Sequence, residues 1–268
     1  MTDMQKSVVT SCGTVSFIEA GEGPTLVFLH GIGSGAASWS AQIEAFSSRY
    51  RVVAWNAPGY GSSDPVRPVK PDATHYSMHL KALLDALEIA DCHLVGHSLG
   101  AIMAVGFTRL YMDRVASLML ASPASGYGPA GAEIQQQRRA GRMSLMKDLG
   151  PEGLARERHK NLLSENAPQW ARDRVREVMS KLRPEGYSQA VELLVNGDIK
   201  ADAEKILLPV TVVVGGSDTV TPPEGCKAVA ESFAAPVFEI LPLLGHACYV
   251  EGPDVFNLVL KAHLEKYR

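Results

Sequence analysis

Apolar runs of strand length recur along the chain and are separated by segments long enough for helices. The runs at 25–30 and 51–56 are apolar except at their ends, which is typical of strands buried on both faces of a sheet. Because a helix-length segment lies between them, we expect these two strands to pair in parallel. Further strands are expected at 93–96, 115–121, 210–214 and 237–241. The alternation of strand and helix predicts an α/β fold with a mostly parallel sheet and helices on both faces.

Two other stretches have patterns of their own. Residues 7–10 and 15–19 are joined by Ser-Cys-Gly-Thr, and together they predict a β-hairpin. After the second apolar run, four leucines have the i, i+3, i+4, i+7 spacing of an amphipathic helix: Leu80, Leu83, Leu84 and Leu87. The hairpin would therefore precede the parallel part of the sheet, and the helix would cover one of its faces.

The strand signal disappears between residues 126 and 200. This segment is rich in Arg, Glu, Gln, Leu and Met. Its breaks, typical of the ends of short helices, are Gly150-Pro151, Ala167-Pro168 and Arg183-Pro184. We therefore expect a helical insertion at 126–200 and one α/β core made of residues 1–125 and 201–268.

The composition is that of an ordinary globular protein. Of the 268 residues 46% are apolar and 21% are charged, and the formal net charge is −3, which indicates neither disorder nor a nucleic-acid-binding surface. No stretch reaches the ~20 apolar residues that cross a bilayer, and residues 1–10 lack the apolar core of a signal peptide. The four cysteines are scattered, unlike those of zinc sites or disulfide frameworks. We expect a cytoplasmic monomer or homodimer without membrane or nucleic-acid partners.

The stretch Gly-His-Ser-Leu-Gly at 96–100 has an apolar run before it and a helix-forming run after it. A serine hydroxyl becomes an effective nucleophile when a sharp strand-to-helix turn presents it to a base. Gly96 and Gly100 lack a Cβ, which permits strained backbone angles and a close approach of strand and helix. We therefore predict that Ser98 is a nucleophile; the alternative is a structural glycine turn in an inactive relative. His97 should point away from Ser98 and pack or form hydrogen bonds.

A nucleophilic serine needs a base, and the base needs an acid that orients it. Asp218 and His246 each follow one of the last two apolar runs. In a parallel sheet these two residues and Ser98 would stand at the carboxyl ends of strands, where such folds gather their sites. The alternative acids, less well placed after a strand, are Asp202 and Asp254. We predict a Ser98, His246, Asp218 triad.

The reaction also needs an oxyanion hole, in which backbone N–H groups face the developing negative charge. We assign the donors to Ile32, in the glycine-rich loop at 30–35, and to Leu99; His30 is expected to hold that loop. The loop lacks the Gly-Lys-Ser/Thr ending and the following acidic residue of nucleotide-binding loops, so no cofactor is expected. His75 and His79 have metal-ligand spacing, but no third ligand is evident, so no metal is expected.

In these motifs the chain resembles the α/β-hydrolase superfamily. The resemblance rests on the loop at 30–33, the segment 56–63, the turn at 96–100, and the Gly-Gly-Ser-Asp and Gly-His sequences that end at Asp218 and His246. These motifs cover nearly the whole chain in the family's order. The resemblance implies an eight-stranded, mostly parallel sheet, and it implies that residues 126–200 form a helical cap, or lid, over the substrate pocket. The nearest group is that of small bacterial carboxylesterases, enol-lactonases and meta-cleavage-product hydrolases.

The substrate pocket is expected between the cap and the core. The side chains predicted to line it are Ser34, Trp39, Arg142, Met143, Met146, Trp170 and Val220. Core packing is the alternative for the methionines and Trp170. The segment 126–200 carries 13 Lys and Arg residues and 10 Asp and Glu residues. The arginines that could meet a substrate carboxylate, or else lie on solvated helix faces, are Arg138, Arg139, Arg142, Arg172, Arg174 and Arg176.

The predicted function is that of a serine hydrolase that cleaves a small carboxylic ester or lactone through an acyl-enzyme. One alternative is carbon–carbon hydrolysis of a ring-fission diketone, the meta-cleavage product. Hydrolases of that kind usually have a tryptophan directly after the catalytic histidine, whereas Ala247 stands here, which favours an ester or lactone. A second alternative is a non-catalytic ligand receptor on the hydrolase fold, and the complete set of catalytic residues argues against it.

Overall fold

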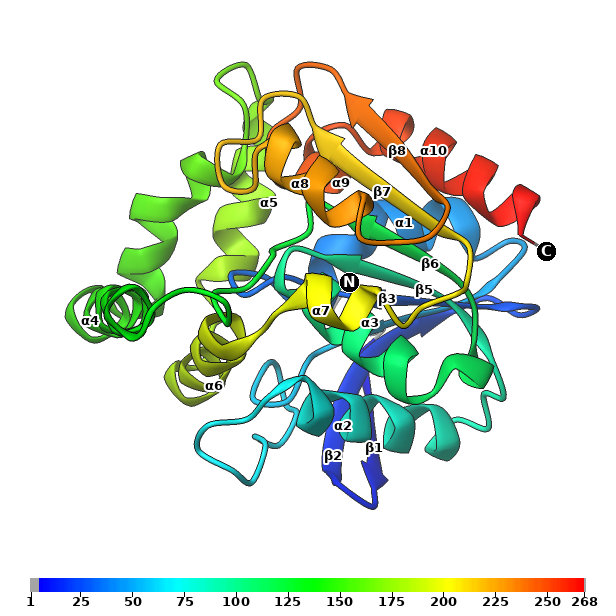
Figure 1. The fold of residues 1–268 in the computed structure, drawn as a ribbon, viewed down its shortest axis with the longest axis horizontal. Helices are drawn as coiled ribbons and strands as arrows, with labels where there is room; N and C mark the ends of the chain where they lie inside the picture. The colour runs from blue at the N-terminus through cyan, green and yellow to red at the C-terminus, as the bar shows by residue number, and fades with distance from the viewer. Residues whose placement is uncertain (1–4, 268) are drawn as a thin grey trace.

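A single sheet forms the centre of the protein, whose computed structural model describes residues 5–267 (Figure 1). The strands are β1 (Gln5–Thr10), β2 (Gly13–Ala20), β3 (Thr25–Leu29), β4 (Arg51–Trp55), β5 (Cys92–His97), β6 (Val115–Ala121), β7 (Val210–Gly215) and β8 (Pro236–Leu241). They form one eight-stranded sheet in the order β1-β2-β4-β3-β5-β6-β7-β8. β2 is antiparallel to both β1 and β4, and all other neighbours are parallel. The expected mostly parallel α/β sheet is confirmed.

The middle of the sheet is buried on both faces. Every residue of β5 and β7 is buried, and in β3 and β4 only the first residue is partly exposed. Such continuous burial follows from helices that cover both faces, and it explains why these strands have no alternation of apolar and polar residues. β8 lies at an edge of the sheet and is mostly exposed or partly exposed.

The hairpin of β1 and β2 is tighter than the sequence suggested. Its connection consists of Ser11 and Cys12, because Gly13 already pairs with Thr10. The Thr10 hydroxyl donates to the carbonyl oxygen of Gly13 (2.7 Å) and accepts from the amide of Cys12 (3.1 Å). Gly13 has a φ of 117°, which a residue without a Cβ adopts at little cost.

Helices cover the two faces of the sheet. α2 (Ala73–Ala86) and α3 (Leu99–Leu110) pack together on one face, and α1 (Ser40–Phe46) and α10 (Pro253–Lys266) pack together on the other (Figure 1). α8 (Pro223–Ala230) packs against β7 and β8. In α2 the leucines at 80, 83 and 84 are buried, as expected for an amphipathic helix.

The chain between β6 and β7 is helical, as the missing strand signal predicts. Its elements are α4 (Ala132–Arg158), the 3-10 turn η4 (His159–Leu162), α5 (Gln169–Met179), α6 (Pro184–Asn196) and α7 (Ile199–Ala203). α4, α5 and α6 lie beyond the carboxyl ends of the strands, at the left of Figure 1. α7 packs against α3 instead, so the expected boundary at 200/201 falls inside a helix of the core. Within residues 5–267 no helix is long and apolar enough to cross a membrane.

The helix break predicted at Gly150-Pro151 is confirmed: α4 consists of two helical segments that meet at a kink. Gly150 has φ 62° and ψ 178°, which is not a helical conformation. Pro151 follows it and has no N–H to donate to the preceding turn. The two halves of α4 therefore run in different directions.

The cysteines are free thiols. Burial raises the pKa of Cys92, Cys226 and Cys248 to about 12. These three thiols are therefore protonated at neutral pH and are poor nucleophiles.

Candidate active site

Ser98 stands on a sharp turn between β5 and α3. Its backbone has φ 53° and ψ −115°, a conformation that is rare for a residue with a side chain. A Cβ at Gly96 would lie 2.5 Å from the carbonyl oxygen of Gly100, and one at Gly100 would lie 2.3 Å from that of Leu29. Because Cβ atoms do not approach other atoms so closely, both positions require glycine. The close packing around Ser98 thus explains the glycine spacing of the motif.

Backbone hydrogen bonds hold this strained turn in place. The amide of Ser98 donates to the carbonyl oxygen of Ala121 in β6 (3.0 Å), and its carbonyl accepts from Ala124 (3.2 Å) and Ala101 (3.0 Å). The side chain of Ser98 faces a cavity. Within residues 5–267 its hydroxyl makes no hydrogen bond to His246; such bonds are often loose before substrate binds.

Asp218 and His246, from the loops after β7 and β8, are hydrogen-bonded to each other. The Nδ1–H of His246 donates to a carboxylate oxygen of Asp218 (2.8 Å), and both side chains are buried. The other carboxylate oxygen accepts the amides of residues 220 and 221. Burial alone would raise the pKa of Asp218, but its hydrogen bonds and the His246 charge hold the pKa below its ordinary value. The alternative acid Asp202 pairs with Arg109 instead (2.8 Å).

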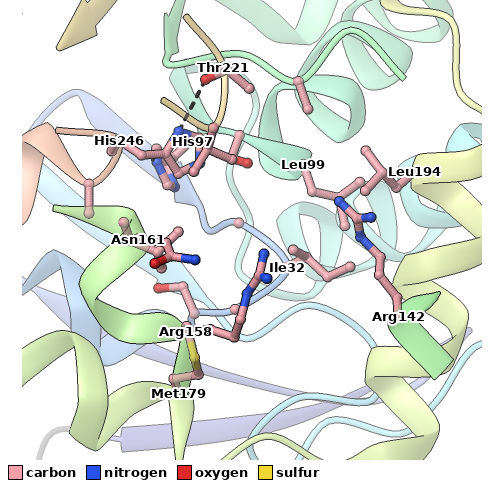
Figure 2. A pocket seen from close by; sticks show the side chains of 18 of the residues that line it. Ile32, His97, Leu99, Arg142, Arg158, Asn161, Met179, Leu194, Thr221 and His246 are labelled. Atoms are coloured by element: carbon pink, nitrogen blue, oxygen red, sulfur yellow. Dashed lines mark hydrogen bonds between the residues drawn. The ribbon is translucent and has the colours of Figure 1, made fainter. Parts of the chain in front are cut away.

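Thr221 joins the same network and was not identified from the sequence. Its hydroxyl oxygen lies 3.1 Å from His246 Nδ1 (Figure 2) and 2.9 Å from Asp218 Oδ2, which the figure does not label. It also lies 3.1 Å from the carbonyl oxygen of Ser122. A hydroxyl three residues after the candidate acid is the signal that could have revealed it, since such spacing brings a side chain back to an Asp carboxylate.

The loop after β3 is held in place by hydrogen bonds of His30 and Tyr60. His30 accepts the amide of Ala57 at Nε2 (3.0 Å) and donates from Nδ1 to the carbonyl oxygen of Gly31 (2.9 Å). Burial lowers the pKa of His30 to about 4, so the ring is neutral. The Tyr60 hydroxyl donates to the carbonyl oxygen of Ile32 (2.9 Å). His30 therefore holds the loop, as expected.

The two assigned oxyanion donors are both available. Within residues 5–267, neither the N–H of Ile32 nor that of Leu99 donates a hydrogen bond to the protein. Leu99 is the first residue of α3, where an N–H has no partner within the helix. Both residues line the cavity that Ser98 faces. The helix N-terminus and the loop after β3 can therefore bind a developing negative charge together.

His97 has the supporting role that was expected of it. Its Nε2–H donates to the backbone carbonyl of His246 (3.1 Å), and the two rings lie 4.8 Å apart. Burial, and to a smaller extent the nearby His246, lower the pKa of His97 to about 3. The neutral ring thus holds the loop of the candidate base without competing as a base.

A buried carboxylate connects the loop of His246 to the segment after α4. Glu251, at the end of α9 (Cys248–Glu251), accepts the amide of Gly245 (2.9 Å) and both the amide (3.0 Å) and the hydroxyl of Ser164. The amide of Ala247 donates to the carbonyl oxygen of Leu162 (2.7 Å). These hydrogen bonds fix the residues on both sides of His246.

The cavity has a volume of about 550 Å³ and lies between the strand ends and the helices of 126–200 (Figure 2). The structure brings Ser98, His246, Ile32 and Leu99 to its wall. Predicted pocket residues that line it are Ser34, Arg142 and Val220. Those that do not line it are Trp39, Met143, Met146 and Trp170.

These four pocket predictions are corrected by how the side chains pack. Trp39 is fully buried and stacks between Phe28 (4.6 Å) and Tyr249 (3.9 Å). Met146 is buried in the core, and Met143 is partly buried against it. Trp170 is 53% exposed on α5. Whether each side chain faces the cavity depends on its direction, and that direction is set by packing between segments distant in the sequence.

The arginines of the helical segment divide into two groups. Arg138 and Arg142 line the cavity, and so do two residues that sequence reasoning missed, Arg158 and Asn161. The other four do not line the cavity. Arg139 pairs with Glu192 (2.8 Å), and Arg174 pairs with Glu177 (3.6 Å). Arg172 donates to the carbonyl of Glu165 (2.6 Å), and Arg176 lines a separate surface depression. The charge excess of the segment did not reveal which arginines face inward.

The histidine pair with metal-ligand spacing has a different explanation. His75 exchanges hydrogen bonds with Asp72 in a capping box at the start of α2. Burial lowers the pKa of His79, and the charge of His75 lowers it further by a smaller amount. Among residues 5–267, no group of three His, Cys, Asp or Glu side chains is arranged to hold a metal ion.

Comparisons with known proteins agree with this architecture. Over 248 residues the chain is 27% identical to "Putative carbamate hydrolase RutD" of Stutzerimonas stutzeri (strain A1501), covering 91% of this chain and 92% of that one. It is 26% identical over 249 residues to 3-oxoadipate enol-lactonase 2 of Acinetobacter baylyi (91% and 90%). A thermophilic esterase from Thermogutta terrifontis superposes with a TM-score of 0.87 at 25% identity, covering 98% of both chains. The alpha/beta hydrolase family model matches residues 26–257, and the chain belongs to this family.

Proposed function

We propose that the protein is a serine hydrolase that cleaves small carboxylic esters or lactones without a cofactor. One observation carries the proposal: Ser98, on its strained turn, shares a cavity with His246, and His246 is hydrogen-bonded to the ionised Asp218. The names of two relatives, an enol-lactonase and an esterase, support the same class of bond. Ala247 after His246 favours an ester or lactone over a carbon–carbon bond.

In the proposed acylation step, His246 takes the proton of the Ser98 hydroxyl while its oxygen attacks the substrate carbonyl. Asp218 orients the imidazole and stabilises its cation, and Thr221 holds both groups. The N–H groups of Ile32 and Leu99 bind the oxyanion; the loss of one such donor typically costs about 3 kcal/mol of transition-state stabilisation. His246 then gives its proton to the leaving alcohol.

In the second half of the cycle, water attacks the acyl-enzyme with His246 again as base. We propose that residues 126–200 act as a cap that limits the entry of water and selects the substrate. Side chains of this segment line the cavity that Ser98 also lines, among them Leu154, Val178 and Tyr187. An apolar lining suits the hydrocarbon part of an ester or lactone.

The test is turnover by purified protein of short p-nitrophenyl esters, a lactone panel, a phenyl carbamate and a ring-fission diketone. Ser98→Ala should reduce ester or lactone turnover by about 10³-fold or more, because the nucleophile is lost. The matched control is Ser144→Ala on α4, whose exposed hydroxyl donates to Asp148. It should keep the wild-type rate.

The outcomes separate the alternatives. Full ester activity in Ser98→Ala would contradict the proposed nucleophile. Serine-dependent turnover of only the carbamate, or of only the diketone, would mean that the protein hydrolyses that bond and not an ester or lactone. Tight, saturable binding of a panel compound with no turnover would favour a receptor on the hydrolase fold.

A further inference from the structure

The charged side chains of the cavity wall are all cationic among the described residues. Three arginines line it, and among its described lining residues there is no Asp or Glu. Two of these arginines, Arg142 and Arg158, belong to α4 and lie 16 positions apart in the sequence. In a straight helix they would be separated by about 24 Å along the axis. The bend at Gly150 redirects the second half of α4, so both side chains reach the same cavity.

Both guanidinium groups are directed toward the interior of the cavity (Figure 2). Within residues 5–267 neither Arg142 nor Arg158 makes a hydrogen bond or an ion pair with the protein. Other arginines of the same region do have partners, as Arg139 has in Glu192. The third cavity arginine, Arg138, lies over the ring of Tyr127 at 5.3 Å. Arg142 and Arg158 thus keep their donors available to a ligand.

The positive field of this pair reaches the buried wall of the cavity. Tyr187 is 6% exposed and lines the cavity. Burial raises the pKa of Tyr187, and the charges of Arg142 and Arg158 partly offset that rise. Apolar residues such as Leu145 and Val175 line the same cavity. A charge at such a wall attracts an anion more strongly than it would in bulk water.

We propose that Arg142 and Arg158 form a subsite for a carboxylate carried by the substrate. The inference rests on the proposed function and makes it more specific: the preferred substrates are esters or lactones of small acids with a second, ionised carboxyl group. Guanidinium donors match the geometry of a carboxylate and form charge-assisted hydrogen bonds with it. The arginine pair selects the anionic end, and Ser98 attacks the ester or lactone carbonyl at the other end.

The probes are monomethyl adipate and methyl hexanoate, two methyl esters of equal chain length that differ in the terminal carboxylate. Wild-type protein should have the higher kcat/KM for monomethyl adipate. Arg142→Met and Arg158→Met should each lower this value about 10- to 100-fold, as expected for the loss of charge-assisted hydrogen bonds, mainly through KM. Turnover of methyl hexanoate should change little. Arg156→Met, on the same helix but outside the cavity, should match the wild type on both esters.

Binding to the Ser98→Ala protein separates failure of the subsite from failure of the proposed function. Calorimetry should detect adipate binding that Arg142→Met and Arg158→Met weaken, even if no ester is ever turned over. Serine-dependent turnover of neutral esters without adipate binding would overturn the subsite and leave the hydrolase intact. Inorganic phosphate that binds as tightly as adipate would overturn the choice of a carboxylate. Equal kcat/KM for the two esters in wild-type protein would overturn it as well.

Discussion

At the scale of single residues, Thr221 contacts both the candidate acid and the candidate base. Thr221→Val removes the hydroxyl but keeps the shape of the side chain, so Asp218 loses one donor and His246 one contact. A hydrogen bond of this kind contributes about 1 kcal/mol. We expect kcat/KM for p-nitrophenyl acetate to fall about fivefold, and urea unfolding should show a loss of about 1 kcal/mol in stability. Thr221→Ser should recover most of the activity, and a fully active Thr221→Val would show that the hydroxyl has no positioning role.

The same scale shows which residues a sequence can reveal. Ser98 could be predicted because its backbone conformation imposes glycines on both sides, which leaves a readable pattern. Arg158 could not, because nothing local distinguishes it from the neighbouring arginines of a charged helix. Its direction depends on the bend at Gly150 and on the helices α5 and α6 against which α4 packs. Trp39 was wrongly assigned to the pocket for the same reason, because nothing in the local sequence indicates that it stacks on Tyr249.

At the scale of elements, the connection between α9 and the segment after η4 depends on Glu251. Its carboxylate accepts three hydrogen bonds, so Glu251→Gln would place an N–H₂ group against one of the donors. We expect a loss of about 1–3 kcal/mol in the free energy of unfolding, the cost of an unsatisfied buried group. Urea unfolding measures this loss. Glu239→Gln, at an exposed position of β8, should stay within about 0.5 kcal/mol of the wild type.

Activity distinguishes this role of Glu251 from a purely structural one. Gly245 and Ala247, on either side of His246, are both bonded to the segment 162–164 or to Glu251. Glu251→Gln should weaken the hold on these two residues. It should therefore lower kcat for neutral esters more than it raises KM, because the base His246 is displaced while the cavity keeps its lining. A Glu251→Gln protein with wild-type kcat would mean that the connection stabilises the fold without orienting His246.

At the scale of the whole molecule, the sheet followed from the order of strands and helices, but the cavity did not. Alternating apolar runs predict parallel strands because each crossover needs a helix. The cavity arises where loops at the strand ends meet α4, α5 and α6. Those contacts join residues far apart in the sequence, and their geometry depends on packing that no short pattern records.

The molecule also contains buried histidines far from the cavity, and these make its stability depend on pH. Ser117 lies between His93 Nδ1 (2.8 Å) and His263 Nε2 (2.9 Å), while His263 Nδ1 contacts Thr211 (2.8 Å). Burial lowers the pKa of His93, and it lowers that of His263 from 6.5 to about 3. Between about pH 6.5 and pH 3 the unfolded chain therefore binds more protons than the folded protein. The contribution of His263 to stability is fully present above about pH 6.5 and is lost as the pH falls toward 3.

Urea unfolding at pH 7.5 and pH 4.5 tests this dependence on His263. Over that interval His263 alone accounts for a decrease of about 1.4 kcal/mol per pH unit below its unfolded pKa. His263→Gln removes the proton-binding group, so the variant should lose less stability on acidification although it is less stable at pH 7.5. Leu260→Ala, on the same face of α10, lowers stability at both pH values and should keep the wild-type pH dependence. An equal pH dependence in His263→Gln and Leu260→Ala would place the acid sensitivity in other groups, because only the first variant deletes a titrating side chain.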